Sequence, residues 1–198
     1  MEITSAISAV LGAFGLSGAA GLNAWLPLLA VGAADRLGWI ELGPSYGWLS
    51  STPALVVLAV VFVLDLIGDK VPALDTVLHA IGAFIAPASG AILFTAETSL
   101  SSNLPPAVAA ILGAITAGGV HASRTVARPF VTGTTAGVGN PVVSTAEDGT
   151  SLVLTILALA VPILAFLVVL VLLAGLGWLT YRAIRWARRR RESDATDG

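Results

Sequence analysis

The sequence contains no cysteine, and only 11% of its 198 residues are Asp, Glu, Lys or Arg. The absence of cysteine excludes disulfides, thiol redox chemistry and cysteine-based metal sites. Soluble domains carry about 25% charged residues, so the composition excludes an ordinary soluble domain. Residues 1–4 also lack the basic region of a secretory signal, and no convincing cleavage site follows, so we expect the first apolar segment to be retained.

The motifs of common enzymes are missing as well. The sequence has no Walker loop, dinucleotide fingerprint, nucleophile elbow or HExxH pattern. His79 and His121 could ligate a metal with nearby aspartates, but no short ligand spacing supports such a site. We therefore expect no enzymatic activity, no cofactor, no bound metal and no nucleic-acid partner.

Long hydrophobic stretches dominate what is present, since 56% of the residues are hydrophobic. The clearest stretch, Leu152–Tyr181, carries no charge and exceeds the roughly 20 residues needed to cross a bilayer. The sequence therefore predicts an integral membrane protein, with the lipid bilayer as its first partner. We expect apolar segments over Ser5–Ala34, Pro53–Gly68, Val71–Thr95 and Pro106–Arg128, and a fifth helix starting near Asp148–Ser151 and ending in the arginines.

Two segments contain glycines and an Asn close to a Pro. In the first segment, glycines recur every three residues from Gly12 to Gly21, ahead of Asn23 and Pro27. The stretch Val131–Ala146 is too short and too rich in Gly and Thr for a full span, and it contains Asn140-Pro141. Broken helices of this kind point to a transporter site. Alternatively, the small residues only allow helices to pack closely.

We therefore predict an all-α membrane protein with about five transmembrane helices and a short broken or re-entrant element at Val131–Ala146. Residues 1–181 form the membrane domain and residues 182–198 a basic, then acidic, tail. Six of the ten basic residues lie between Arg182 and Arg191, which predicts a cytoplasmic C-terminus in the plasma membrane and a contact with anionic lipid. A weak internal repeat is also present, because a Pro follows a His after eight residues both at His79–Pro87 and at His121–Pro129. Chance explains this repeat equally well.

Charged residues inside apolar segments are costly and mark function or buried pairs. His121, Arg124 and Arg128 follow helical spacing and form one basic stripe, which we expect to face another helix. The acidic residues expected to oppose this stripe lie between Asp65 and Asp75. The candidate binding residues are Asn23, Asp65, Asp69, Lys70, Asp75, His79, His121, Arg124, Arg128, Thr132, Thr134, Thr135 and Asn140.

Three functions fit these residues. We favour a small transporter or channel for an ion or a small polar or anionic solute, working as a homo-oligomer whose Gly-rich faces pack together. A second hypothesis is a membrane scaffold or assembly subunit whose charges only pair internally. In a third, Arg124 and Arg128 bind the phosphate of an anionic lipid.

Three stretches resemble a known family: GLNAWLPLL (Gly21–Leu29), DKVPALD (Asp69–Asp75) and GNPVVSTAED (Gly139–Asp148). They are similar to bacterial membrane proteins grouped as domain of unknown function 4126, and the resemblance covers about Ser8 to Leu173. It implies a multi-pass membrane architecture without an established activity. The family's Arg-Pro step after the third helix reads Ala86-Pro87 here. The resemblance draws attention to the polar residues within its motifs: Asn23, Asp69, Lys70, Asp75, Asn140, Glu147 and Asp148.

Overall fold

The computed structural model describes residues 2–68, 72–135 and 139–196, and within these ranges every regular element is a helix. This confirms the predicted all-α class. The elements are α1 (Glu2–Leu22), α2 (Trp25–Arg36), η1 (Gly47–Ser50), α3 (Thr52–Gly68), α4 (Pro72–Thr98), α5 (Pro106–Thr135), α6 (Asn140–Ala160) and α7 (Pro162–Thr196).

Four of the described helices are long and apolar enough to cross a bilayer. They contain the stretches Ile3–Leu22, Val77–Thr98, Pro106–Val126 and Asn140–Ala160. Two shorter apolar helical stretches, Thr52–Gly68 and Pro162–Gly175, accompany them. The chain is therefore a multi-pass membrane protein, in rough agreement with the predicted five spans.

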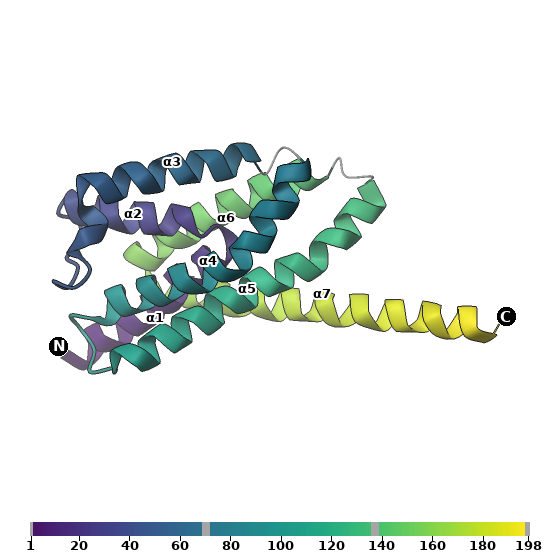
Figure 1. The fold of residues 1–198 in the computed structure, drawn as a ribbon. Coiled ribbons are helices and arrows are strands. Elements are labelled where there is room, and N and C mark those ends of the chain that lie inside the picture. The colour runs from purple at the N-terminus through teal and green to yellow at the C-terminus, as the bar shows by residue number, and fades with distance from the viewer. Residues whose placement is uncertain (1, 69–71, 136–138, 197–198) are drawn as a thin grey trace.

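Helix α1 forms the centre of the bundle and contacts α4, α5, α6 and α7, while α2 packs against α3 and η1 to one side (Figure 1). The residues Leu16, Leu93, Leu154 and Val169 are fully or almost fully buried where these helices meet. Buried hydroxyls also tie the helices together. Ser17 Oγ of α1, for example, donates to Gly90 O of α4 at 3.0 Å.

The glycines of α1 lie at its closest helix contacts. A Cβ atom added at Gly15 would lie 2.7 Å from the Cβ of Ala165, and one at Gly18 would lie 2.5 Å from Val169 Cγ2. One at Gly21 would lie 2.5 Å from Val120 Cβ. These glycines therefore allow close packing within the chain, the second of the two interpretations of this pattern.

The first apolar segment is divided at Asn23, two residues after the last glycine of the series. Helix α1 stops at Leu22 and α2 starts at Trp25, so the predicted break is confirmed. Figure 1 shows the chain turning back at this point, which places α2 alongside α3.

The region around Val131–Ala146 differs from the short element predicted for it. Residues 131–135 complete α5 and residues 140–146 begin α6, so only the connection between them separates the two helices. Within the helical part of this region the Thr145 hydroxyl has a partner in the preceding turn, since it donates to the carbonyl oxygen of Pro141 at 2.7 Å.

The predicted fifth helix is also different. Asp148 and Ser151 lie inside α6 instead of capping its start, and Pro141 occupies the first turn, where a missing N–H costs nothing. The stretch beyond is split at Val161, because Pro162 cannot donate to the preceding turn and disfavours helical backbone before it. Helix α7 then continues through the arginine-rich segment to Thr196.

Candidate functional site

The site is built on the interruption between α1 and α2. The Oδ1 atom of the buried Asn23 accepts hydrogen bonds from the backbone N–H groups of Trp25 and Leu26, both at 3.0 Å. An N-cap residue makes these bonds, and they satisfy two donors that the first turn of α2 leaves without an intrahelical acceptor. Asn23 therefore defines where α2 begins.

On the other side of the interruption, Arg124 of α5 donates hydrogen bonds to the carbonyl groups at the end of α1. Its Nη1 donates to the carbonyl oxygen of Gly21 at 3.1 Å and also to that of Leu22. The last carbonyls of a helix lack intrahelical donors and carry the negative end of its dipole, so a guanidinium is a favourable partner. Within an apolar bundle such groups must find their partners in the protein.

The same guanidinium forms an ion pair with α6. Glu147 Oε2 lies 2.5 Å from Nη2 of Arg124 and 3.0 Å from Nη2 of Arg128, so one carboxylate oxygen accepts from both arginines. Both arginines are only 9% exposed, which confirms that the basic stripe of α5 faces other helices. We expected it to meet the acidic residues between Asp65 and Asp75. Asp69 and the side chain of Asp75 lie outside the described part of the chain, so this expectation stays a prediction; among the described side chains the structure records ion pairs of the stripe with Glu147.

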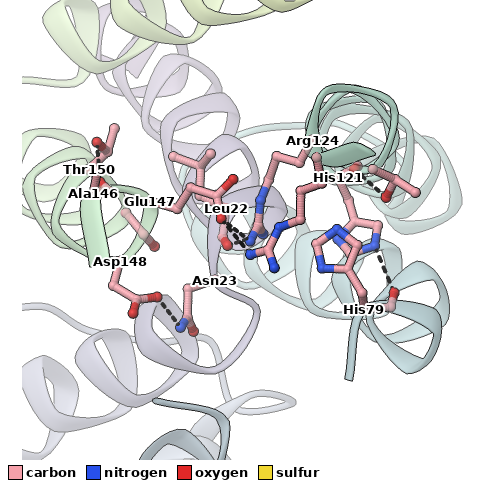
Figure 2. A network of polar contacts seen from close by, with 12 residues as sticks. Leu22, Asn23, His79, His121, Arg124, Ala146, Glu147, Asp148 and Thr150 are labelled. Atoms are coloured by element: carbon pink, nitrogen blue, oxygen red, sulfur yellow. Dashed lines mark hydrogen bonds and ion pairs between the residues drawn. The ribbon is translucent and has the colours of Figure 1, made fainter. Parts of the chain in front are cut away.

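The amide of Asn23 links two carboxylates. Its Nδ2 donates to Oδ1 of Asp148 on α6 at 2.9 Å and to Oδ2 of Asp65 on α3 at 3.2 Å. Figure 2 shows Asn23 below the guanidinium of Arg124, with Asp148 beside it. Asn23 and Arg124 thus connect the interruption to α3, α5 and α6.

The two histidines of the predicted weak repeat meet on the other side of Arg124. The rings of His79 and His121 lie 5.0 Å apart at an angle of 32° (Figure 2). Nε2 of His121 lies 3.2 Å from the carbonyl oxygen of His79. A Cβ atom at Gly82 would lie 2.7 Å from Cε1 of His121, so the absence of a side chain at Gly82 leaves room for the second ring.

These polar groups border a cavity of about 280 Å³. Five polar residues line it, from the interruption and from α3, α4 and α5: Asn23, Asp65, His79, His121 and Arg124. The rest of the lining is mainly apolar, including Val61 and Leu64 of α3 and Ile81 and Ile85 of α4. Arg124 therefore has two environments, because it pairs with Glu147 and also lines the cavity.

The cavity lies near one end of the candidate spans. His79 is close to the start of Val77–Thr98, and Arg124 is close to the end of Pro106–Val126. The far end of α7 extends from this same end of the bundle, and α1 starts at the opposite end (Figure 1).

The predicted site residues whose side chains the structure describes fall into two groups. Those that line the cavity, together with Arg128, come together around the interruption. Thr132, Thr135 and Asn140 lie at the α5–α6 connection, where Thr132 Oγ1 donates to Asn140 Oδ1 at 3.0 Å and Gly139 N donates to Thr135 Oγ1 at 3.1 Å. They do not line this cavity.

Four predicted positions cannot be compared in the same way. Asp69 and Lys70 lie outside the described residues. Asp75 belongs to α4 and Thr134 to α5, but the side chains of both lie outside the described part of the chain.

Glu147 and Asp148 were absent from the predicted binding residues, although both contact them in the structure. The expected helix start near Asp148 accounts for an acidic residue there without a binding role, because acidic side chains are favourable in the first turn of a helix. The resemblance does draw attention to both through the GNPVVSTAED stretch, where they lie seven and eight residues after Asn140 and thus two turns into α6.

Comparisons with known proteins give the family without an activity. No curated protein and no solved structure matches the chain. The family model described as a domain of unknown function, DUF4126, matches residues 10–182. This match includes the interruption, the cavity and the arginine–glutamate pairs, and the chain therefore belongs to the DUF4126 family.

Proposed function

We propose that this protein is a small transporter or channel, without enzymatic activity, that passes an ion or a small polar solute across the membrane. The observation that carries the proposal is the cavity at the α1–α2 interruption, whose lining includes a carboxylate, a guanidinium, an amide and two imidazoles. Ionisable side chains within the spans of a membrane protein commonly face a cavity and mark the path of an ion or solute.

The interruption supports the same proposal. Helix ends that meet inside a membrane protein offer backbone dipoles and polar caps to a solute, a common arrangement in transporters. Here the end of α1 and the start of α2 adjoin the cavity through Leu22, Asn23 and Trp25. Because Asn23 and Arg124 connect three other helices to this point, a solute that disturbs their bonds can alter the packing of the bundle.

Solute flux into liposomes tests the proposal. The purified chain is reconstituted and assayed with potassium, sodium, protons, chloride, acetate, glycerol and urea. Ala24 lines the cavity, so Ala24→Phe fills it and should abolish the flux. Ala122→Phe, on the exposed face of α5, is the matched control and should retain it. The absence of flux with every solute would reject the proposal.

A second candidate is a membrane scaffold whose charges only hold the helices in register. The arrangement of Arg124, Arg128 and Glu147 favours it, because one carboxylate accepts from both guanidinia and a buried network can specify packing. For this candidate, Ala24→Phe and the wild type should be equally silent in every flux assay. The third hypothesis, lipid binding by these arginines, has less support, because both are enclosed by other helices.

The orientation and partners complete the proposal. We place the C-terminus on the cytoplasmic side of the plasma membrane, because the arginines that follow Tyr181 obey the positive-inside rule. The same segment, Arg182–Arg191, would bind anionic lipid. A homo-oligomer also remains part of the proposal. Its interface would use surfaces other than the glycine face of α1, since that face is occupied within the chain.

A further inference from the structure

Two nitrogen atoms beside the cavity have unused hydrogen-bonding capacity. Among the residues that the structure describes, Nε of Arg124 and Nε2 of His79 are buried without a hydrogen-bond partner. Buried polar atoms are nearly always paired, so each such exception requires an explanation. Both residues line the same cavity, so an ordered water molecule or a ligand held there can pair them.

The remaining contacts of Arg124 keep its side chain in place. Nη1 is bound to the end of α1 and Nη2 to Glu147, which leaves the Nε–H group as a donor without an acceptor. His79 can act as a second donor in the tautomer that carries its proton on Nε2. Two N–H donors, one on a guanidinium, select a ligand with a negatively charged oxygen.

The charges in the lining limit the charge of the ligand. Arg124 contributes one positive charge and Asp65 one negative charge, and the Oδ2 atom of Asp65 accepts a hydrogen bond from Asn23. The Asp65 carboxylate repels any anion, and at the same distance it repels a dianion about twice as strongly as a monoanion, so the two donors on α4 and α5 offset the repulsion more easily for a monoanion. This favours a carboxylate over a doubly charged phosphate.

The cavity also limits the size and polarity of the group attached to the carboxylate. At about 280 Å³, the cavity falls just below the roughly 300–1,000 Å³ that is typical of ligand pockets, so the ligand is small. Its wall is mainly aliphatic, with Val61 and Leu64 on α3 and Ile81 and Ile85 on α4. An aliphatic wall favours a short apolar chain over a polar one, because burying a polar group without a partner is unfavourable.

We propose that the cavity binds a small monocarboxylate with a short apolar chain, whose carboxylate accepts hydrogen bonds from Nε of Arg124 and Nε2 of His79 after a small adjustment of these side chains. The inference rests on the proposed role of the cavity in solute binding and specifies the class of solute. The histidine pair then has a role, since the packing of His121 against His79 fixes the position of the ring that binds the ligand.

Calorimetry on the full chain in lipid nanodiscs tests this proposal with sodium butyrate, sodium acetate, sodium phosphate, sodium chloride and 1-butanol at constant ionic strength. Butyrate should bind more tightly than acetate, and phosphate, chloride and butanol should bind much more weakly. Arg124→Gln should weaken butyrate binding by about tenfold or more, as expected for the loss of a charged hydrogen bond. The control Arg36→Gln, an arginine that donates to Ser50 O far from the cavity, should have no effect.

His79→Phe provides a second variant if Arg124→Gln does not fold. It keeps a ring against His121 and removes only the ring nitrogens, so it should fold and still lose butyrate affinity. Unchanged butyrate affinity in His79→Phe would overturn the proposal, as would equal binding of butyrate and butanol, equal binding of butyrate and phosphate, or no binding of butyrate.

The two proposals can fail separately. If another solute is transported and butyrate does not bind, the transport function is retained and the monocarboxylate is rejected as the ligand. Butyrate binding that depends on Arg124 and His79, without flux of butyrate or of any solute in the liposome panel, would retain the binding site and reject the transporter.

Discussion

The guanidinium of Arg124 donates to the carbonyl oxygen of Leu22, the last residue of α1, across a separation of 102 residues in the sequence. Through this bond a side chain in the middle of α5 closes the end of α1. Its other amino group forms an ion pair with Glu147, so the same guanidinium joins three helices at the edge of the cavity.

Replacement of Arg124 should therefore destabilise the fold strongly. Arg124→Gln leaves the Gly21 and Leu22 carbonyls without this donor and Glu147 with one cation fewer, which should cost about 3–5 kcal/mol, as when one partner of a buried ion pair is removed. Arg124→Lys keeps the charge but lacks the planar fork that reaches both helices, so its loss should be smaller. Reversible unfolding in mixed micelles measures the difference, and Arg36→Gln, which alters an exposed arginine, should remain close to wild type.

Arg128 and Glu147 should show strong coupling. Arg128 lies 3.0 Å from the same Glu147 oxygen that accepts from Arg124, so Glu147→Gln weakens both pairs at once. A double-mutant cycle with Arg128→Gln and Glu147→Gln should give an interaction energy of about 1–3 kcal/mol. If the two substitutions were additive, within about 0.5 kcal/mol, the pair would make no net contribution to stability.

Local sequence patterns were sufficient to predict most of the long spans and the buried face of α5. Hydropathy located most of the long spans, and the spacing of His121, Arg124 and Arg128 correctly predicted a buried basic stripe. Periodicity shows which face of a helix is distinctive but not which helix lies opposite it. The stripe pairs with Glu147 of α6, which the spacing of residues within α5 could not single out as a partner.

Composition also has a limit in predicting where a helix is interrupted, as the regions around Asn23 and Thr145 show. A glycine series followed by Asn and Pro indicated an interruption, and the structure has one there. A similar pattern near Asn140 indicated a broken element, yet the residues that follow are helical. Composition alone does not reveal that threonine hydroxyls bond back to the preceding turn, as Thr145 does with Pro141.

The glycine face of α1 should be sensitive to a single methyl group. Gly15→Ala would place a Cβ 2.7 Å from that of Ala165 and 2.8 Å from that of Ala158, and this overpacking should cost about 1–3 kcal/mol. Gly149→Ala is the matched control on α6, because no heavy atom of the described chain lies within 4 Å of the place that its Cβ would occupy. The control should retain or slightly raise the thermal midpoint, since alanine favours helix more than glycine does. Equal midpoints for both variants would contradict the close contact.

The orientation of the chain can be tested directly because the sequence contains no cysteine. Ser45 and Ser101 are exposed in the loops at the end of the bundle where α1 begins, and α7 ends on the opposite side (Figure 1). With a cytoplasmic C-terminus, Ser45→Cys and Ser101→Cys should react with a membrane-impermeant maleimide in intact cells. Ser193→Cys, beyond the arginines, should react only after the membrane is opened. The reverse labelling pattern would place the arginines outside and, with them, the end of the bundle that holds the cavity. A solute would then reach Arg124 and His79 from outside the cell first, and the cytoplasmic C-terminus predicted by the positive-inside rule would be wrong.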